Sequence, residues 1–400
     1  MSYTYLLPSM AEYAKKFGRL DSLDFKIIKA MLKHGVSNVQ RLTKEVEAPQ
    51  QTISYRIRRL DNEDLVRFRG LIDETKLGLK SYSVLASTSI GKEDPSGIAL
   101  TSFPLWRYLA VVDGWKLGNY VRYAIPQDKE RDLTTFLDEL RKRELISHYE
   151  ICETNSPRYP LLDMDFYAKK EPTLTFSWEN WAGNIDSYAN ATTPIDEEES
   201  GKRAEFDLVD LMILRCLELN ARTTQRRIVT EVAHALKEKD SRKFIPMVSR
   251  RIRKNIKPQG LIKGYRVYLF PNQEYTVLLF MFYLEFSNRT SLEKFTRALN
   301  HLPYNTAYEK ILGKDAIFVR LVIPSFQFAE MRKSLTTLAE KGYVKDAHMF
   351  MLDLAHGTWD NVEMHQMFKD GAWNFSYGAA VEMLENTLQR LDNKQSRAEN

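Results

Sequence analysis

Two short basic segments of related sequence are the part of this chain best suited to chemistry. They span residues 50–60 and 246–256, and a shift of 195 residues places one on the other. Apolar residues recur at helical spacing in each, which predicts a helix with one buried stripe and one cationic face. Such a face suits the major groove of double-stranded DNA, where cations contact phosphates and amides or hydroxyls contact base edges. The residues that overlay are Ser54, Arg56, Ile57 and Arg58 in the first segment and Ser249, Arg251, Ile252 and Arg253 in the second.

The polar side chains of these segments divide into candidate base readers and candidate phosphate binders. Amides and hydroxyls lie early on the first helix and are expected at the bases, whereas the arginines are expected at phosphates. The second segment is richer in cations, which favours affinity over sequence discrimination. A solvated cationic helix face is the alternative interpretation, and charge alone would favour it. The DNA-binding candidates are Gln50, Gln51, Thr52, Ser54, Tyr55, Arg56, Arg58, Arg59, Arg67 and Arg69 in the first half, and Lys243, Ser249, Arg250, Arg251, Arg253, Lys254, Lys257 and Lys263 in the second.

Catalytic and metal-binding motifs are not apparent. The seven histidines show no metal-ligand spacing, and there is no nucleophile elbow, phosphate loop or Cys-x-x-Cys motif. Cys152 and Cys216 lie far apart and support neither a disulfide framework nor a zinc cluster. His148 and His348 fall near equivalent places on two predicted strands, which keeps a role for them open. We therefore predict that the protein is not an enzyme and holds no cofactor or metal.

The first basic helix must be positioned by neighbouring helices. Asp21 is a candidate N-cap for a helix that ends at His34-Gly35. A second short helix is expected at about residues 38–46, and Pro49 lies near the start of the basic helix. Residues 65–72 are expected to form a wing of two short strands or a hairpin. Three helices and a wing make a winged helix-turn-helix.

The following segment predicts a second kind of domain, with the order β-α-β-β-α-β. This order is that of the ferredoxin-like fold. The expected strands are 81–90, 106–113, 119–125 and 147–154, and the expected helices are 95–102 and 128–144.

The whole arrangement then repeats, which indicates a tandem duplication. Residues 206–210 overlay residues 20–24 at an offset of 186, so the offset of 195 at the basic helix implies an insertion near residues 237–243. The predicted fold class is α+β, with two winged helix-turn-helix domains and two ferredoxin-like (βαββαβ) domains in tandem repeat. The expected domains are an arm at 1–19, a winged helix-turn-helix at 20–79, a ferredoxin-like domain at 80–155, an aromatic strap and acidic linker at 156–205, a second winged helix-turn-helix at 206–272, a second ferredoxin-like domain at 273–354, and a strap with a helix at 355–400.

The two straps share a short aromatic pattern. Residues 176–178, Phe-Ser-Trp, resemble residues 375–377, Phe-Ser-Tyr. We expect the straps to cover the sheets of the ferredoxin-like domains. The final helix, at about residues 378–391, has no obvious counterpart in the first half.

Bulk composition excludes several classes of protein. The net charge is only +5 and the hydrophobic fraction is 44%, as in soluble globular proteins rather than disordered or membrane proteins. The most apolar run, residues 275–286, is too short to span a bilayer, and the first 20 residues do not resemble a signal peptide. We expect a cytoplasmic protein with no membrane partner.

The order of these parts resembles the Lrp/AsnC (feast/famine) transcription regulators. The stretches that carry the resemblance are residues 20–28, 52–60 and 73–79 in the first half, and residues 206–214, 248–254, 260–265 and 312–315 in the second. Members of that family are usually about half this length, so the chain resembles two protomers fused head to tail. The resemblance implies a DNA-binding regulator whose effector domains pair through their sheets, as an intramolecular pseudo-dimer, a homodimer or both.

The resemblance also implies a small-molecule effector, often an amino acid, near the turn between the paired strands. Asp113 and Gly114 occupy that turn in the first half, and Gly313 and Asp315 occupy it in the second. An ordinary glycine turn is the alternative interpretation.

Two other functions remain open at this point. The first is an architectural protein that bridges DNA with little sequence preference. The second, less favoured, is an enzyme like the siroheme decarboxylases, which share this architecture and pair around a tetrapyrrole. The cationic helix faces argue against the enzyme, because a decarboxylase has no need of them.

Overall fold

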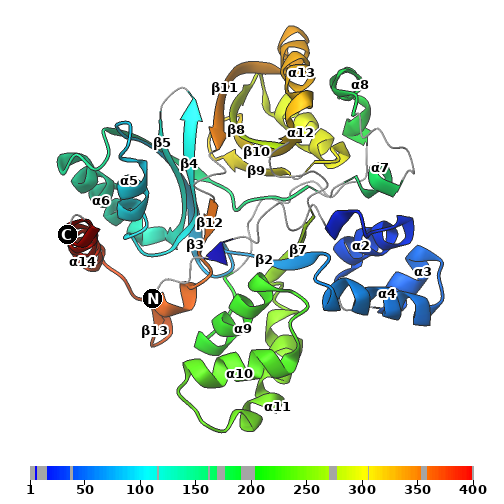
Figure 1. The fold of residues 1–400 in the computed structure, drawn as a ribbon, viewed down its shortest axis with the longest axis horizontal. Helices are drawn as coiled ribbons and strands as arrows, with labels where there is room; N and C mark the ends of the chain where they lie inside the picture. Colours follow the sequence, from blue (N-terminus) through cyan, green and yellow to red (C-terminus); the bar gives the residue numbers. More distant parts are fainter. Residues whose placement is uncertain are drawn as a thin grey trace.

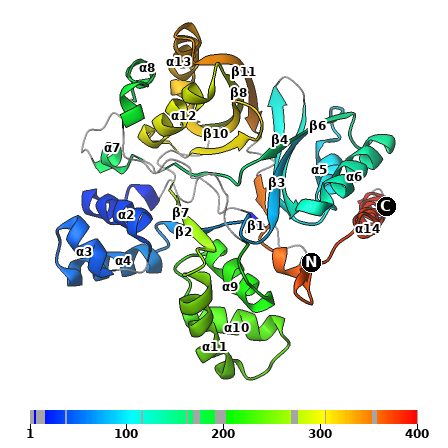
Figure 2. The ribbon, with the colours of Figure 1, turned by 180° about the vertical axis from the view of Figure 1, so that it is seen from behind.

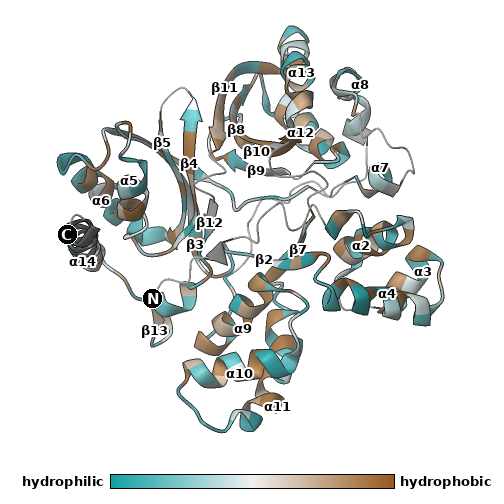
Figure 3. Cartoon of the chain, in the orientation of Figure 1, coloured by the Kyte–Doolittle hydropathy of each residue, from teal (hydrophilic) through white to brown (hydrophobic). Residues whose placement is uncertain are grey.

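The computed structural model describes residues 5–6, 16–36, 39–114, 117–160, 163–168, 176–190, 203–269, 277–304, 306–352 and 358–398. Helices and strands are mixed throughout this part of the chain. In Figure 1, two units of helix and sheet lie next to each other, and two units of helices lie below them, beyond strands β2 (Arg67–Ile72) and β7 (Ile262–Tyr268). Hydrophobic residues are concentrated on the strands and on helix α9 (Leu208–Leu219), whereas helix α10 (Gln225–Ala235) carries hydrophilic stretches (Figure 3).

The first helical unit comprises α2 (Ser22–His34), α3 (Val39–Val46) and α4 (Gln50–Asn62). Asp21 is the N-cap of α2, as expected, and forms a capping box with Asp24. The second unit comprises α9 (Leu208–Leu219), α10 (Gln225–Ala235) and α11 (Phe244–Arg251), which continues as a π-helical turn at Ile252–Ile256. Asp207 and Asp210 form the capping box of α9. Residues 236–243 separate α10 from α11, a longer connection than residues 47–49 in the first unit, as the predicted insertion requires.

The expected wings are not hairpins. The first is a single strand, β2 (Arg67–Ile72), and the second is also a single strand, β7 (Ile262–Tyr268). The two strands pair with each other in antiparallel fashion, with Gly70 opposite Tyr265. A Cβ atom at Gly70 would lie 3.1 Å from the carbonyl oxygen of Leu217, so glycine permits the close approach of α9. Each wing therefore finds its partner strand in the other half of the chain, which removes the need for a hairpin.

Two units with the order β-α-β-β-α-β follow the helical units. In each, the closing strand pairs with the first strand and the two middle strands pair with each other, as in a ferredoxin-like sheet. The first contains β3 (Leu79–Ser87), α5 (Glu93–Leu100), β4 (Trp106–Gly114), β5 (Gly118–Pro126), α6 (Glu130–Lys142) and β6 (His148–Thr154). The second contains β8 (Val277–Phe286), α12 (Arg289–Ala298), β9 (Thr306–Ile311), β10 (Ala316–Pro324), α13 (Phe328–Glu340) and β11 (Val344–Leu352). Short 3-10 turns occur at Gln127–Lys129, Ser241–Lys243, Leu299–His301 and Ser325–Gln327.

The two sheets close into one ring of strands. The ring runs β4-β5-β3-β6-β9-β10-β8-β11 and returns to β4, so the halves join at β4–β11 and at β6–β9. The register at the two junctions is similar, with Leu352 opposite Val112 and Thr154 opposite Ile311. Tyr120, Met281, Phe318 and Phe350 belong to the apolar cluster that joins strands of both halves inside the ring. Strand β12 (Thr358–Asp360) pairs with β4, and β1 (Tyr5–Leu6) pairs with β12.

The straps cross from one half to the other. In the first strap, α7 (Met164–Ala168) packs on α2, and α8 (Trp178–Gly183), followed by a 3-10 turn at Ser187–Asn190, packs on α13 of the second sheet unit. In the second strap, a 3-10 turn at Met364–Met367 packs on α9, and α14 (Tyr377–Ala398) packs on α6 of the first sheet unit (Figure 2). Strands β13 (Phe368–Lys369) and β14 (Ala372–Trp373) form a small hairpin before α14.

The straps correct two expectations. Helices α8 and α14 cover the helices of the sheet units, not the sheets, because the inner sheet faces are already buried within the ring. Helix α8 is also a short counterpart of α14, since each begins directly after the serine of the shared aromatic pattern, Ser177 or Ser376. The Ser177 hydroxyl accepts a hydrogen bond from the Asn180 backbone, and the Ser376 hydroxyl accepts one from Ala379.

Candidate nucleic-acid interface

Helix α4 presents a polar face that is held outward by its apolar stripe. Ile53, Ile57 and Leu60 are buried against the rest of the first helical unit. Because these residues fix the rotation of the helix, the opposite face must be exposed. Gln50, Gln51, Tyr55 and Arg58 are exposed, Tyr55 to 66%, while Thr52 and Ser54 are half-buried. Arg58 makes no ion pair with any carboxylate in the described part of the chain.

Two other arginines of α4 do not join this face. The Arg56 guanidinium lies 2.5 Å from an oxygen of Asp21, and that of Arg59 lies 2.5 Å from an oxygen of Asp24. Asp24 is fully buried. Burial raises the pKa of the Asp24 carboxyl despite the opposing hydrogen bond and arginine charges. Arg56 and Arg59 therefore fasten α4 to the capping box of α2, and their predicted role as phosphate contacts is corrected.

The second helical unit repeats this arrangement. Arg251 lies 2.5 Å from Asp207 and 3.1 Å from Asp210, which form the capping box of α9. The Asn255 amide adds a hydrogen bond of 2.6 Å to Asp210. Arg251 overlays Arg56 at the offset of 195, so the two halves keep the same ion pair between their first and third helices. The predicted phosphate role of Arg251 is corrected for the same reason.

The remaining candidates of the second unit lie mostly at the surface. Lys243 is exposed but pairs with Glu238 at 2.6 Å, and Ser249 is half-buried. Among these candidates, the exposed cations that make no ion pair within the described residues are Arg250, Arg253, Lys254 and Lys257. Arg226 and Arg227, at the start of α10 behind its N-cap Thr224, are also exposed and were missed in the sequence. The Thr-Gln-Arg-Arg run at a helix start was the available signal, since the helix before a recognition helix often contacts the DNA backbone.

The candidates on the wing strands lie away from the helix faces. Arg69 is 6% exposed and is enclosed by polar groups of the joint between the helical units and the ring, so its predicted phosphate role is corrected. Arg67 is half-buried and lies 3.4 Å from Asp64. Lys263 is half-buried on β7. The pairing of β2 with β7 explains these positions, because it turns both strands towards the ring.

The candidate effector residues are placed at two different junctions of the ring. Gly114 lies opposite Phe350 of β11, and a Cβ atom there would lie 2.7 Å from the Met349 carbonyl oxygen. Asp113 precedes it and is exposed. Gly313 has a φ of +76°, and the Asp315 carbonyl accepts a hydrogen bond from the Phe286 backbone of the same half. Leu312, directly before this turn, donates a backbone hydrogen bond to Glu153 of the first half. Each turn therefore adjoins a different junction of the ring, and the two turns are not brought together.

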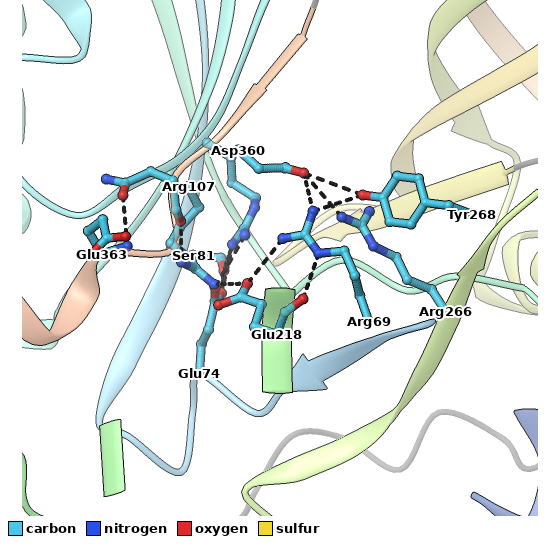
Figure 4. Close-up of polar contacts among 11 residues, drawn as sticks. Arg69, Glu74, Ser81, Arg107, Glu218, Arg266, Tyr268, Asp360 and Glu363 are labelled. Carbon is cyan, nitrogen blue, oxygen red and sulfur yellow. Dashed lines mark hydrogen bonds and ion pairs between the residues drawn. The ribbon is translucent and has the colours of Figure 1, made fainter. Parts of the chain in front are cut away.

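A cluster of buried charged groups lies where the wing strands meet the ring (Figure 4). Glu74 accepts hydrogen bonds from Arg122 at 2.6 Å and from Arg107 at 2.9 Å. Arg107 also reaches Glu218 of α9 at 2.5 Å. Arg69 donates to Asp360 of β12 at 2.6 Å. One network thus ties β2, the first sheet unit, α9 and the second strap together.

Two carboxylates of this cluster, Glu74 and Asp360, are kept ionised by the arginines. Burial alone would raise the pKa of Glu74, but Arg122 and Arg107 lower it to about 2. Burial likewise opposes ionisation of Asp360, and Arg69 and Arg266 hold its pKa well below the usual value. The sequence signal for this cluster was an arginine inside each of two apolar strands, Arg107 in β4 and Arg122 in β5.

The histidines do not form a metal centre in the part of the chain that the structure describes. His148 on β6 lies 3.7 Å from Glu150, and His348 on β11 lies 3.1 Å from Asp346. Both side chains are substantially exposed, at 51% and 37%. His356 lies outside the described residues.

The first helical unit belongs to a recognised class. Residues 20–67 match a family model described as winged helix-turn-helix DNA-binding. This part of the chain is therefore similar to DNA-binding winged helix-turn-helix units, within a protein of mixed helix and sheet. No helix in the described ranges is both long enough and apolar enough to cross a membrane.

Solved structures give a more particular comparison. The siroheme decarboxylase NirDL is similar over 93% of this chain and 100% of its own, with 11% identity and a TM-score of 0.50, which concerns the fold. An AsnC family transcriptional regulator from Agrobacterium tumefaciens is similar over 34% of this chain and 89% of its own, with 20% identity and a TM-score of 0.28. AsnC of E. coli is similar over 34% and 91%, with 16% identity and a TM-score of 0.26. The predicted resemblance to Lrp/AsnC regulators is thus confirmed as a resemblance. No curated protein matches the chain.

Proposed function

We propose that this protein is a transcription regulator that binds double-stranded DNA with sequence preference. The observation that carries the proposal is the outward face of α4 within residues 20–67, which match the DNA-binding family model. Gln50, Gln51 and Tyr55 supply groups that read base edges, and Arg58 supplies a phosphate contact. Arg250, Arg253, Lys254 and Lys257 give the second helical unit affinity for the DNA backbone.

We further propose that the chain is a tandem duplication whose halves act as an intramolecular pair. Each half is a helix-turn-helix unit followed by a ferredoxin-like unit and a strap, with the boundaries predicted from the sequence. The matched ion pairs of Arg56 and Arg251, the pairing of β2 with β7, and the two junctions of the ring support this proposal. A paired chain of this kind places two recognition helices on one duplex. The cellular location expected of such a regulator is the cytoplasm.

The test is a polarisation titration of the full chain with duplex DNA from its own promoter and with a scrambled duplex, at two salt concentrations. We expect tighter binding to the promoter that persists at the higher salt. Arg58→Ala is the informative variant, because Arg59 supports the fold through Asp24 and would confound a double substitution. Equal, steeply salt-dependent binding to both duplexes would instead indicate an architectural protein, and no binding at all would reject both.

A second candidate is an enzyme that acts on a tetrapyrrole. It is favoured by the likeness of the fold to NirDL, one structure of which is a complex with an iron-uroporphyrin III analogue. Against it, His148 and His348 are substantially exposed, and the described residues contain no cluster of histidines that could hold a metal ion. Titration of the chain with that analogue, followed by its Soret absorbance, separates the two candidates, since a regulator without a tetrapyrrole site leaves the spectrum unchanged.

A further inference from the structure

A cleft opens at the buried charged cluster, between the wing strands and the mouth of the ring. It encloses about 440 Å³ not occupied by atoms, part of it open to solvent. Its walls come from β2, β7, the first sheet unit, the C-terminal end of α9 and both straps, so it touches the DNA-binding pair and the ring together. The turns to which the family resemblance pointed, at residues 113–114 and 313–315, do not line it.

The charges of this cleft do not balance. Five cations line it, the four arginines Arg69, Arg107, Arg122 and Arg266 and one lysine, Lys263, against three carboxylates, Glu74, Glu218 and Asp360, which leaves two formal positive charges. Arg69, Arg107 and Arg122 are all buried. Leaving a charge uncompensated in buried surroundings is costly, so the cleft favours the entry of an anion.

The hydrogen bonding of the cleft is also incomplete within the described residues. The Nε atom of Arg122 is buried and meets no acceptor there, although the rest of its guanidinium is bonded to Glu74. One oxygen of Glu218 likewise meets no donor there. Both residues line the cleft, so an oxyanion bound there lies beside the arginine that lacks an acceptor, and a water molecule or a ligand hydroxyl lies beside the carboxylate that lacks a donor.

We propose that this cleft binds a small oxyanion, a carboxylate or a phosphate, and that this anion is the effector of the regulator. Guanidinium groups bind both kinds of oxyanion through paired N–H donors. Arg266 is the residue that an incoming anion contacts first. It is half-buried at 17% side-chain exposure, stacks on Tyr159 and Tyr268, and pairs with Asp360 at 3.2 Å. Only the effector role rests on the proposed DNA binding; anion binding itself does not.

The first experiment measures anion binding without DNA. The thermal midpoint of the full chain is recorded in inorganic phosphate, in malonate and in chloride at equal ionic strength, and calorimetry gives the dissociation constants. We expect at least one of the two oxyanions to raise the midpoint by several degrees above chloride, and the arm that does so identifies the ligand group. Identical midpoints in all three salts would overturn the proposal.

Variants then locate the site. Arg266→Gln should weaken binding of the active anion at least tenfold, and Lys263→Gln, on the same wall, should weaken it several-fold and serves if the first variant does not fold. Arg289→Gln is the matched control, because Arg289 is exposed on α12 and pairs only with Glu293 among the described residues. If both cleft variants kept the same affinity for the anion, the anion would bind elsewhere and the assignment of the site to this cleft would be wrong.

A final measurement separates this inference from the proposed function. The polarisation titration with promoter DNA is repeated with and without the active anion, since an effector must change DNA affinity and DNA must change anion affinity by the same factor. Anion binding without any DNA binding would reject the regulator but keep the cleft. An affinity for promoter DNA that does not change when the anion binds would reject the effector role alone.

Discussion

At the residue scale, the arginines of α4 fall into two groups with different surroundings. Arg58 faces outward, whereas Arg56 and Arg59 reach the carboxylates that cap α2. The distinction follows from helical spacing, because Arg56 and Arg59 are three residues apart on the side of the helix that faces α2. A basic helix can therefore use part of its charge to hold its own orientation.

The first prediction concerns this division. Arg56→Ala should lower the free energy of unfolding by roughly 3 kcal/mol, since it leaves the buried Asp24 with fewer partners. Arg58→Ala should change stability by less than about 0.5 kcal/mol while it weakens DNA binding. Urea unfolding of both variants measures the first quantity and polarisation measures the second. If Arg58→Ala were less stable than Arg56→Ala, the ion pair between Arg56 and α2 would contribute nothing to stability.

The second prediction concerns pH and Glu74. Its pKa falls from an ordinary value of 4.5 to about 2 in the folded chain, so its contribution to stability is full above pH 4.5 and is lost as the pH falls towards 2. The shift corresponds to about 3 kcal/mol. Urea unfolding of the unmodified chain and of Glu74→Gln, between pH 7 and pH 3.5, should give a difference that shrinks as the pH falls. The control Glu293→Gln, at a half-buried surface residue, should show little difference in stability, and a constant difference for Glu74→Gln would contradict the assignment.

Sequence reasoning located these residues better than it assigned their partners. The offset overlays Arg56 on Arg251, and the structure gives both residues the same kind of ion pair. It could not show that the partner is a capping carboxylate, because the sequence does not give the rotation of α4 relative to α2. Arg69 was misassigned for a related reason, since its burial depends on a strand from the other half.

At the element scale, the straps carry much of the connection between the halves. Trp178 of α8 is 2% exposed, stacks on Tyr304 with ring centroids 5.7 Å apart, and donates a hydrogen bond of 2.6 Å to Gln327. Phe375, just before α14, packs edge-on against Phe103 of the first sheet unit. The shared aromatic pattern predicted that the two straps are related, but the element that each one covers depends on the crossing of the chain.

The third prediction concerns α8. Trp178→Ala should lower the free energy of unfolding by roughly 3–5 kcal/mol, because it removes a buried aromatic group and a hydrogen bond together. Tyr55→Ala, at an aromatic residue that is 66% exposed, is the control and should change stability little. Chemical unfolding of both variants provides the comparison. A loss below about 1 kcal/mol for Trp178→Ala would mean that α8 docks weakly.

At the scale of the whole molecule, the ring of strands is completed within one chain. Each sheet has two edge strands, β4 and β6 in the first half and β11 and β9 in the second. Strand β4 pairs with β11 and β6 pairs with β9, so these edges are already occupied. The order of strands in each sheet was predictable from the order of elements. The closure of the ring was not, because the sequence allowed pairing within the chain or with a second copy.

The fourth prediction follows from that closure. Light scattering after gel filtration should give the mass of one chain, 46.7 kDa, at micromolar concentration. With promoter DNA, one chain should bind one duplex, and protection should extend over two half-sites about one helical turn apart, roughly 34 Å. A stable dimer of chains, or a single protected half-site, would contradict the intramolecular pair.

Because the two halves are joined in one chain, a substitution changes only one side of the pair. In an assembly of two identical chains, each change appears on both sides of the two-fold axis, so a site near that axis is bound to be symmetric. Here Glu218, which lines the arginine cleft, corresponds to Leu32 at the offset of 186 between the halves, and Arg122 faces Glu74 while its counterpart Arg320 faces Glu309. Under the proposed duplication, each half is free to change separately, so a ligand without symmetry of its own has one orientation in which to bind.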